Sequence, residues 1–405
     1  MAVGYQGLPE LMPVAGVRLA TVKAGIKKPD RRDLVLFELA PDTQCAAVFT
    51  QNRFCAAPVQ VAKQHLSVGR PGYLLINTGY ANAGTGERGL ADAIACCTAV
   101  AEVAGCEPER VLPFSTGVIG EPLPVERIKA AVPALLAELS DTGWAAAAEG
   151  IMTTDTVPKA ASRTLELGGQ RVTLTGVSKG AGMIRPNMAT MLSFVATDAA
   201  VAPELLDSAL REAVAVSFNR ITVDGDTSTN DALLLLATGR SGASVIDAEN
   251  SDYRRFVAAL TDICIELAQA IVRDGEGATK FIAVKVEGAE TVAEAEQVAF
   301  TVAESPLVKT ALFAADPNWG RILAAIGRAG VDDLAVERVR LYLDDLLIAD
   351  KGGRVADYDE SAAAERMAKE ELTIGIRLER GSAEATVWTC DFSYDYVRIN
   401  ADYRT

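Results

Sequence analysis

Short apolar runs that end at glycine alternate with amphipathic stretches along this 405-residue chain. Short runs are typical of buried strands, and amphipathic stretches are typical of helices that cover a sheet, so the pattern predicts a mixed α/β fold. The expected strands are 73–76, 171–177, 191–196, 232–237, 281–286 and 339–343. The expected helices are 90–103, 125–138, 361–371, one that opens at Pro203 and one capped by Asn250 or Ser251.

Length and charge narrow the class of protein further. A chain of 405 residues favours two or three lobes over a single core. The formal net charge of −15 repels phosphates, which makes nucleic acid a poor partner and a small molecule a better one. With 49% apolar and 23% charged residues and no long uncharged run, the composition excludes disordered and membrane classes.

Histidine and cysteine usage excludes two kinds of site. His65 is the single histidine, so the chain has almost no residues from which to build a Ser-His-Asp triad or a multi-histidine metal site. Its neighbours Lys63 and Gln64 are polar, which predicts a surface position for His65. The seven cysteines are scattered, odd in number and never spaced C-x-x-C, which predicts reduced, mostly buried thiols in a cytoplasmic protein. The N-terminus shows no secretion signal pattern.

With histidine nearly absent, the remaining groups that could activate a hydroxyl nucleophile are a lysine, a carboxylate or an amino terminus. The segment 179–192 combines a glycine-rich turn with Thr190 at the head of an expected strand. A cut before Thr190 would give it an α-amine with a pKa of roughly 7.7 to 8.0, suited to a general base. The residues alone leave this open, because a threonine at a strand start is usually structural. None of the glycine clusters matches a nucleotide-phosphate motif.

Several motifs follow one another over nearly the whole chain, at 51–53, 77–86, 115–120, 151–156, 179–183, 189–192, 224–231, 274–280, 316–321 and 400–405. In this order they resemble the glutamate N-acetyltransferase family of arginine biosynthesis, also called ornithine acetyltransferases. The resemblance implies a layered helix-sheet-sheet-helix α/β build and a self-cleaving enzyme with an N-terminal threonine. The cut falls between Ala189 and Thr190, giving chains 1–189 and 190–405 that stay together, commonly as α2β2.

The resemblance also implies roles for individual residues. Thr190 is the nucleophile, and the Thr116 hydroxyl with the Gly117 backbone N–H forms the oxyanion hole. The positions that match the family's substrate contacts are Thr153, Lys179, Thr190, Glu276, Asn400 and Thr405. A lysine such as Lys179 suits the substrates' α-carboxylate, and a carboxylate such as Glu276 suits an ammonium group of ornithine. No chemical step is assigned to Asp155 or to the segment 316–321. We expect both to have a structural role near the site.

The implied reaction moves an acetyl group from N-acetylornithine to glutamate through an acetyl-Thr190 ester, without a metal or organic cofactor. Some family members also use acetyl-CoA as donor, and the sequence does not distinguish whether this chain does. An alternative from another class is an amidohydrolase or aminopeptidase of related fold, in which water replaces glutamate. A further alternative is a non-enzymatic small-molecule binding protein on the same scaffold, against which the intact Thr190 and both oxyanion residues argue.

Overall fold

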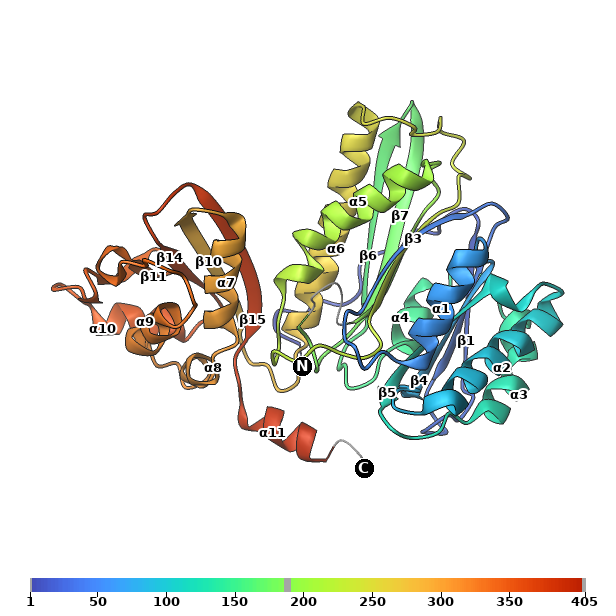
Figure 1. The fold of residues 1–405 in the computed structure, drawn as a ribbon, viewed down its shortest axis with the longest axis horizontal. Helices are drawn as coiled ribbons and strands as arrows, with labels where there is room; N and C mark the ends of the chain where they lie inside the picture. Colours follow the sequence, from blue (N-terminus) through green and yellow to red (C-terminus); the bar gives the residue numbers. More distant parts are fainter. Residues whose placement is uncertain (1, 186–190, 403–405) are drawn as a thin grey trace.

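The computed structural model describes residues 2–185 and 191–402, and Figure 1 shows two lobes within them. The larger lobe holds two packed sheets, and a third sheet with its own helices forms the smaller lobe. The first sheet has the order β1-β2-β4-β5 and comprises Val17–Val22, Leu34–Leu39, Tyr73–Tyr80 and Val111–Val118. The second has the order β3-β9-β8-β7-β6 and comprises Gln44–Phe49, Ala232–Ala237, Leu192–Thr197, Gln170–Lys179 and Lys159–Leu167.

The two sheets of the larger lobe pack face to face through a shared apolar core. Phe37 and Phe114 of the first sheet both contact Phe194 of the second, with ring centroids 5.4 and 5.1 Å apart. Strands with both faces buried need helices on their outer sides. These helices are α1 (Ala57–Val68), α2 (Gly86–Ala104) and α3 (Val125–Ala137) over the first sheet, and α5 (Pro203–Ala215) and α6 (Ser251–Arg273) over the second. The predicted helix-sheet-sheet-helix layering is therefore confirmed.

The smaller lobe begins directly after α6, where segment 274–280 leads into β10 (Phe281–Ala289). The other strands of its sheet are β11 (Arg340–Leu343), β12 (Leu346–Asp350), β13 (Gly353–Arg354), β14 (Glu371–Arg377) and β15 (Ala383–Cys390). Its helices are α7 (Val292–Ala303), α8 (Pro306–Phe313), α9 (Trp319–Gly327) and α10 (Glu360–Met367). This lobe has a separate apolar core.

Short elements complete the fold. Helix α4 (Trp144–Gly150) closes one end of the core between the two packed sheets, and three 3-10 turns span Pro108–Arg110, Phe218–Arg220 and Val336–Arg338. Helix α11 (Tyr394–Ala401) leaves the smaller lobe after β15 and runs beneath the larger one, as Figure 1 shows. Among residues 2–185 and 191–402, no helix has the length and apolar character needed to cross a bilayer.

Two local predictions were wrong. His65 is buried between α1 and β5, at 5% exposure. Its ring nitrogen Nδ1 lies 2.8 Å from the Val111 carbonyl oxygen, and this contact gives the buried polar ring a hydrogen-bond partner. The helix expected at 361–371 ends at Met367, and Glu371 opens β14. Strand β14 pairs in parallel with β10, and this long-range pairing overrides the local helical pattern. All seven cysteines are unpaired, and four of them are buried, as predicted.

Candidate active site

A cavity of about 260 Å³ lies where the two packed sheets, the segment after α6 and the end of α11 meet. Six residues predicted for the site line this cavity: Thr116, Gly117, Thr153, Lys179, Glu276 and Asn400. We call it the acyl cavity. The remaining predicted residues, Ala189, Thr190 and Thr405, lie outside the described residues.

Thr116 and Gly117 lie near the end of β5, in the first sheet. Gly117 has a φ of +133°, and a β-carbon there would lie 2.3 Å from the carbonyl carbon of Gly79 on the paired strand β4. Only glycine allows that close approach. The backbone of Gly117 is therefore fixed against β4 at the cavity wall.

Lys179 is the last residue of β7, in the second sheet, and it pairs with Leu192 at the head of β8. Its Nζ donates a hydrogen bond to Thr116 Oγ1 at 3.1 Å, so the bond joins the two sheets across the cavity. Burial lowers the pKa of Lys179, because a low-polarity environment disfavours the charged amine, although the nearby Asp155 carboxylate opposes the shift.

A buried ion network lies behind Lys179. Lys159 Nζ lies 2.7 Å from Asp155 Oδ1 and 2.6 Å from Asp274 Oδ2, and all three side chains are at most 1% exposed. Burial alone would raise the pKa of Asp155, but the positive charges of Lys159 and Lys179 outweigh it and hold that pKa well below its usual range. Asp155 also accepts hydrogen bonds from the backbone N–H groups of Thr153 and Gly180. The network thereby fixes the loop that carries Thr153 and the backbone that follows Lys179 at the end of β7.

Glu276 enters the cavity from the segment between α6 and β10. Its backbone N–H donates to the Ala181 carbonyl at 2.8 Å, and its carboxylate accepts a 2.8 Å hydrogen bond from Asn400 Nδ2 on α11. A β-carbon at Gly182 would lie 2.4 Å from the Glu276 carboxyl group, so glycine at that position makes room for the carboxylate. Glu276 is 6% exposed, which makes it a buried anion at the cavity wall.

Asp231 is a second buried carboxylate, just before β9. Strand β9 runs parallel to β8, and the backbone N–H of the next residue, Ala232, bonds to the Met191 carbonyl. Asp231 therefore lies beside the head of β8. Its Oδ2 atom has no hydrogen-bond partner among the described residues, and burial raises its pKa well above the usual value.

Two further residues were not predicted from the sequence, because their partners are distant in the chain. Asn230 Nδ2 donates to the carbonyls of Ala81 and Ser115, at 2.6 and 2.9 Å, and so holds the strand that carries Thr116. Arg31 donates to the carbonyl of Thr153 at 3.0 Å. Asn230 lies in the quoted motif 224–231, which marked the segment without indicating its role, and no pattern marked Arg31.

The layered α/β lobe and its small polar cavity, walled by a threonine hydroxyl, a buried lysine and a buried carboxylate, define an enzyme that handles a small charged molecule. The chain belongs to the ArgJ family, whose model matches residues 18–405. It is an acetyltransferase of arginine biosynthesis, which confirms the family and the function that the motifs predicted.

The chain is similar to the following relatives and solved structures. The arginine biosynthesis bifunctional protein ArgJ of Methylococcus capsulatus is 56% identical over 395 residues, which are 98% of this chain and 97% of the relative. A crystal structure of that bifunctional protein from Bacillus halodurans is 42% identical, with a TM-score of 0.50, over 52% of this chain and 99% of the solved one. The ornithine acetyltransferase of Mycobacterium tuberculosis, solved with ornithine, is 38% identical over 44% of this chain and 94% of its own, with a TM-score of 0.39.

Proposed function

We propose that this chain cuts itself between Ala189 and Thr190 and then moves an acetyl group from N-acetylornithine to glutamate through an ester on Thr190. The observation that carries the proposal is the hydrogen bond from Lys179 to Thr116 in a cavity that also holds Glu276. This arrangement supplies an oxyanion site, a cation and an anion within one small volume. The oxyanion site suits the acetyl-amide carbonyl of the substrate, the cation suits its α-carboxylate, and the anion suits its side-chain ammonium.

The oxyanion site follows from the direction of the hydrogen bond. A lysine ammonium group can only donate, so the Thr116 oxygen accepts from Lys179 and the Thr116 hydrogen remains to be donated elsewhere. Donated into the cavity together with the Gly117 backbone N–H, it stabilises the negative oxygen that forms when an amide carbonyl is attacked. The positive charge on Lys179 strengthens the Thr116 hydroxyl as a donor.

The charges of the wall match those of N-acetylornithine. Its α-carboxylate suits Lys179, and its side-chain ammonium suits Glu276, which Asn400 orients at 2.8 Å. A substrate held at both ends presents its acetyl-amide carbonyl in a fixed position. Glutamate carries the same α-carboxylate, which Lys179 can hold in the second half-reaction.

In the proposed cycle, the Thr190 hydroxyl attacks the acetyl carbon, and its α-amine takes the hydroxyl proton and passes it to the departing amine of ornithine. The amine of glutamate then attacks the ester, and the Thr190 oxygen regains a proton. The cycle needs no metal or organic cofactor. The amidohydrolase alternative would replace glutamate with water and would release acetate.

Self-cleavage has support from chain lengths. The solved Bacillus halodurans chain is matched over 99% of its length, yet it spans only 52% of this chain, as expected if that relative's chain is divided. Here the cut would separate β7 from β8, whose residues 174–179 and 192–197 pair in an antiparallel ladder. This ladder would hold chains 1–189 and 190–405 together. An α2β2 assembly in the cytoplasm remains our expectation.

The direct test is an assay of purified protein with N-acetylornithine and glutamate, followed by an assay with acetyl-CoA and glutamate. We expect N-acetylglutamate and ornithine in equal amounts from the first, which is glutamate N-acetyltransferase activity. Product from the second assay would add amino-acid N-acetyltransferase activity. Release of acetate from N-acetylornithine at the same rate with and without glutamate would contradict the proposal and favour the amidohydrolase.

A further inference from the structure

A buried carboxylate, Asp391, holds the segment that carries Glu276 into the acyl cavity. Asp391 directly follows β15 and is 0% exposed. Its Oδ1 accepts hydrogen bonds from the backbone N–H groups of Thr279 and Lys280, at 2.8 and 2.9 Å, and its Oδ2 accepts one from the Thr279 hydroxyl at 2.5 Å. These three bonds join the segment 274–280, between α6 and β10, to the end of β15.

The end of β15 is itself fixed by a buried lysine, Lys309 of α8. Its Nζ donates hydrogen bonds to Thr389 Oγ1, at 2.8 Å, and to the Cys390 carbonyl. Its carbonyl accepts from the backbone N–H of Phe392 at 3.2 Å, and its positive charge interacts favourably with the Asp391 carboxylate. Asp391 is therefore held on both sides along the chain, so it can fix the segment that it contacts.

The same segment also holds the start of α11. The Ser393 hydroxyl donates to the Gly277 carbonyl at 2.6 Å and caps α11 by accepting from the backbone N–H of Asp395. Gly277 has a φ of +71°, and a β-carbon there would lie 2.5 Å from the backbone nitrogen of Tyr396. Only glycine allows that close approach. The residue after Glu276 and the first turn of α11 therefore pack backbone against backbone.

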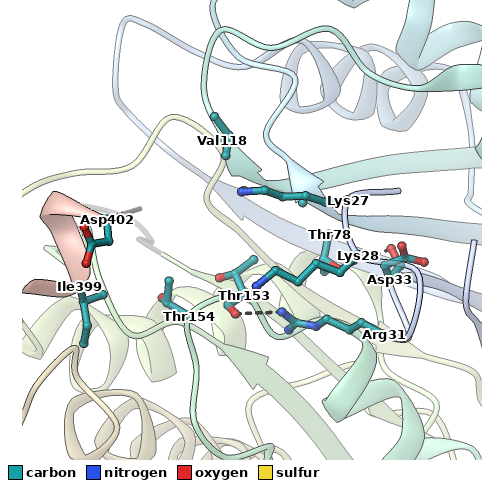
Figure 2. Close-up of a pocket in the computed structure, with 12 residues that line it drawn as sticks. Lys27, Lys28, Arg31, Asp33, Thr78, Val118, Thr153, Thr154, Ile399 and Asp402 are labelled. Atoms are coloured by element: carbon teal, nitrogen blue, oxygen red, sulfur yellow. Dashed lines mark hydrogen bonds between the residues drawn. The ribbon is translucent and has the colours of Figure 1, made fainter. Parts of the chain in front are cut away.

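Helix α11 extends from this point to the acyl cavity. None of its described residues, Tyr394–Ala401, is buried, so the hydrophobic core does not fix its position. Asn400 lies seven positions after Ser393, about 10 Å along a helix, and its Nδ2 donates to Glu276 Oε2 at 2.8 Å. Figure 2 shows that the same end of α11 lines the adjoining cavity, through Ile399 and Asp402. The contacts at the start of α11 thus decide where Asn400 meets Glu276.

We propose that Asp391 is a positioning residue that fixes the Glu276 carboxylate where it meets the substrate's side-chain ammonium, and that it thereby determines the preference for a donor with a charged side chain. The proposal rests on the proposed function, in which Glu276 binds this ammonium. Asp391 does not line the acyl cavity, so it acts through Glu276. A charge-assisted hydrogen bond depends on distance and angle, and a displacement of about 1 Å in an active site can lower the rate about a hundredfold.

The test compares two acetyl donors, N-acetylornithine and N-acetylnorvaline, which has the same carbon chain without the side-chain ammonium. We expect the kcat/KM of wild type to be about tenfold or more higher for N-acetylornithine, because a hydrogen bond to a charged group adds to binding. Asp391→Ala leaves three donor groups of Thr279 and Lys280 without their acceptor, so the segment shifts and this preference should fall about fivefold or more. Loss of folded enzyme lowers both kcat/KM values equally and leaves the preference unchanged.

A milder variant and a matched control complete the comparison. Thr279→Val keeps the shape of threonine and both backbone bonds, removes only the hydroxyl bond to Asp391, and should lower the preference about threefold. Asp198 is also buried and accepts a backbone N–H, from Thr173 at 2.8 Å, but it lies outside the acyl cavity. Asp198→Ala should keep the preference within about 1.5-fold of wild type. The wild-type preference in Thr279→Val or in a folded Asp391→Ala, or an equal fall in Asp198→Ala, would overturn the proposal.

The Glu276→Gln background tests whether Asp391 acts through Glu276. With Glu276 present, Asp391→Ala should lower the kcat/KM for N-acetylornithine about fivefold or more, and in Glu276→Gln by less than about twofold, because residues that act through one contact are not additive. Thr279→Val should show the same dependence on the background. Equal losses in both backgrounds would overturn the proposal, because Asp391 would then act on the fold in general.

Failure of this inference is distinguishable from failure of the proposed function. If wild type prefers N-acetylornithine and the variants at Asp391 and Thr279 keep that preference, Asp391 does not position Glu276 and the proposed function stands. If wild type uses both donors equally well, Glu276 does not bind the ammonium, and the inference is overturned while acetyl transfer stands. If wild type transfers acetyl to glutamate from neither donor, the proposed function itself is wrong and the role of Asp391 falls with it.

Discussion

Lys179 donates a hydrogen bond to Thr116 across 3.1 Å, and this bond joins the two packed sheets at the wall of the acyl cavity. The two residues are 63 positions apart in the chain. Because a lysine ammonium group can only donate, the Thr116 oxygen accepts this bond and its hydroxyl hydrogen is left for another partner. The oxyanion role of Thr116 and the substrate role of Lys179 therefore depend on each other.

Replacing Thr116 with valine should lower kcat by about a hundredfold or more, because one oxyanion donor is lost without a change in shape. Thr116→Ser keeps the hydroxyl and serves as the matched control, with kcat within about tenfold of wild type. Steady-state rates with N-acetylornithine and glutamate check this. If valine leaves kcat within a few-fold of wild type, Thr116 does not stabilise the oxyanion.

The KM for N-acetylornithine should depend on pH through Lys179. Burial lowers the Lys179 pKa, so the ammonium loses its proton at a lower pH than an exposed lysine does. Once it is neutral it no longer attracts the substrate's α-carboxylate, and the KM should rise as the pH rises from about 7 toward 10. In Lys179→Met the KM should be high throughout and flat with pH. A flat wild-type profile would remove Lys179 from carboxylate binding.

Breaking the buried ion network should destabilise the fold strongly. Lys159→Met leaves the buried carboxylates of Asp155 and Asp274 without their cation, and we expect the free energy of unfolding to fall by about 3 to 5 kcal/mol. Arg163→Ala removes the half-exposed ion pair with Glu266 and should change the free energy of unfolding by about 1 kcal/mol or less. Urea unfolding at pH 7 measures both. Equal effects would mean that the network contributes no more than a surface pair.

The same network predicts a pH dependence. The folded-state pKa of Asp155 lies below its unfolded value, so its contribution to stability is present above the unfolded pKa of about 3.9 and is lost as the pH falls toward the folded one. The difference between wild type and Lys159→Met should therefore shrink as the pH drops from about 5 to 3. A difference that stays constant over this range would contradict the assignment.

The contribution of Asp231 to stability should change with pH in the opposite direction to that of Asp155, because burial raises the pKa of Asp231. A raised folded-state pKa means that stability falls as the pH rises from the unfolded value toward the folded one. Asp231→Asn removes this penalty, so the variant should be more stable than its parent at pH 7 and equal to it near pH 4. Both proteins are compared in a Thr190→Ala background by thermal unfolding, so that both remain single chains. A lower stability at pH 7 would show that the carboxylate is stabilising there.

Local patterns predicted about half of the elements of the larger lobe, and β1, β2, β3, β5, β6, α1 and α4 were not among them. The strand at 232–237 was placed at its observed bounds, and the side chain of Asn250 caps α6 by accepting from two backbone N–H groups. Both features depend on neighbouring residues only, so they can be read from a short stretch of sequence. The end of α10 depends instead on how β14 pairs with β10, and the local pattern did not indicate it.

The limits of the sequence prediction lie in long-range contacts. Lys159 and Asp274 are 115 positions apart, and no local pattern pairs them. The smaller lobe was not separated from the larger because segment 274–280 has no linker composition and instead serves the site through Glu276. Family motifs predicted six residues of the acyl cavity, but they did not indicate that Lys179 and Thr116 would meet across it.

Mass spectrometry of the purified protein, incubated with N-acetylornithine alone, tests self-cleavage and the acetyl-Thr190 ester together. We expect two polypeptides, 1–189 and 190–405, with a single acetyl group on the second, at Thr190, that added glutamate removes. Thr190→Ala should remain one unlabelled chain. A wild-type protein that turns over as a single chain, or whose second fragment begins at another residue or carries no acetyl group, would show that Thr190 is not an N-terminal nucleophile that holds the acetyl group.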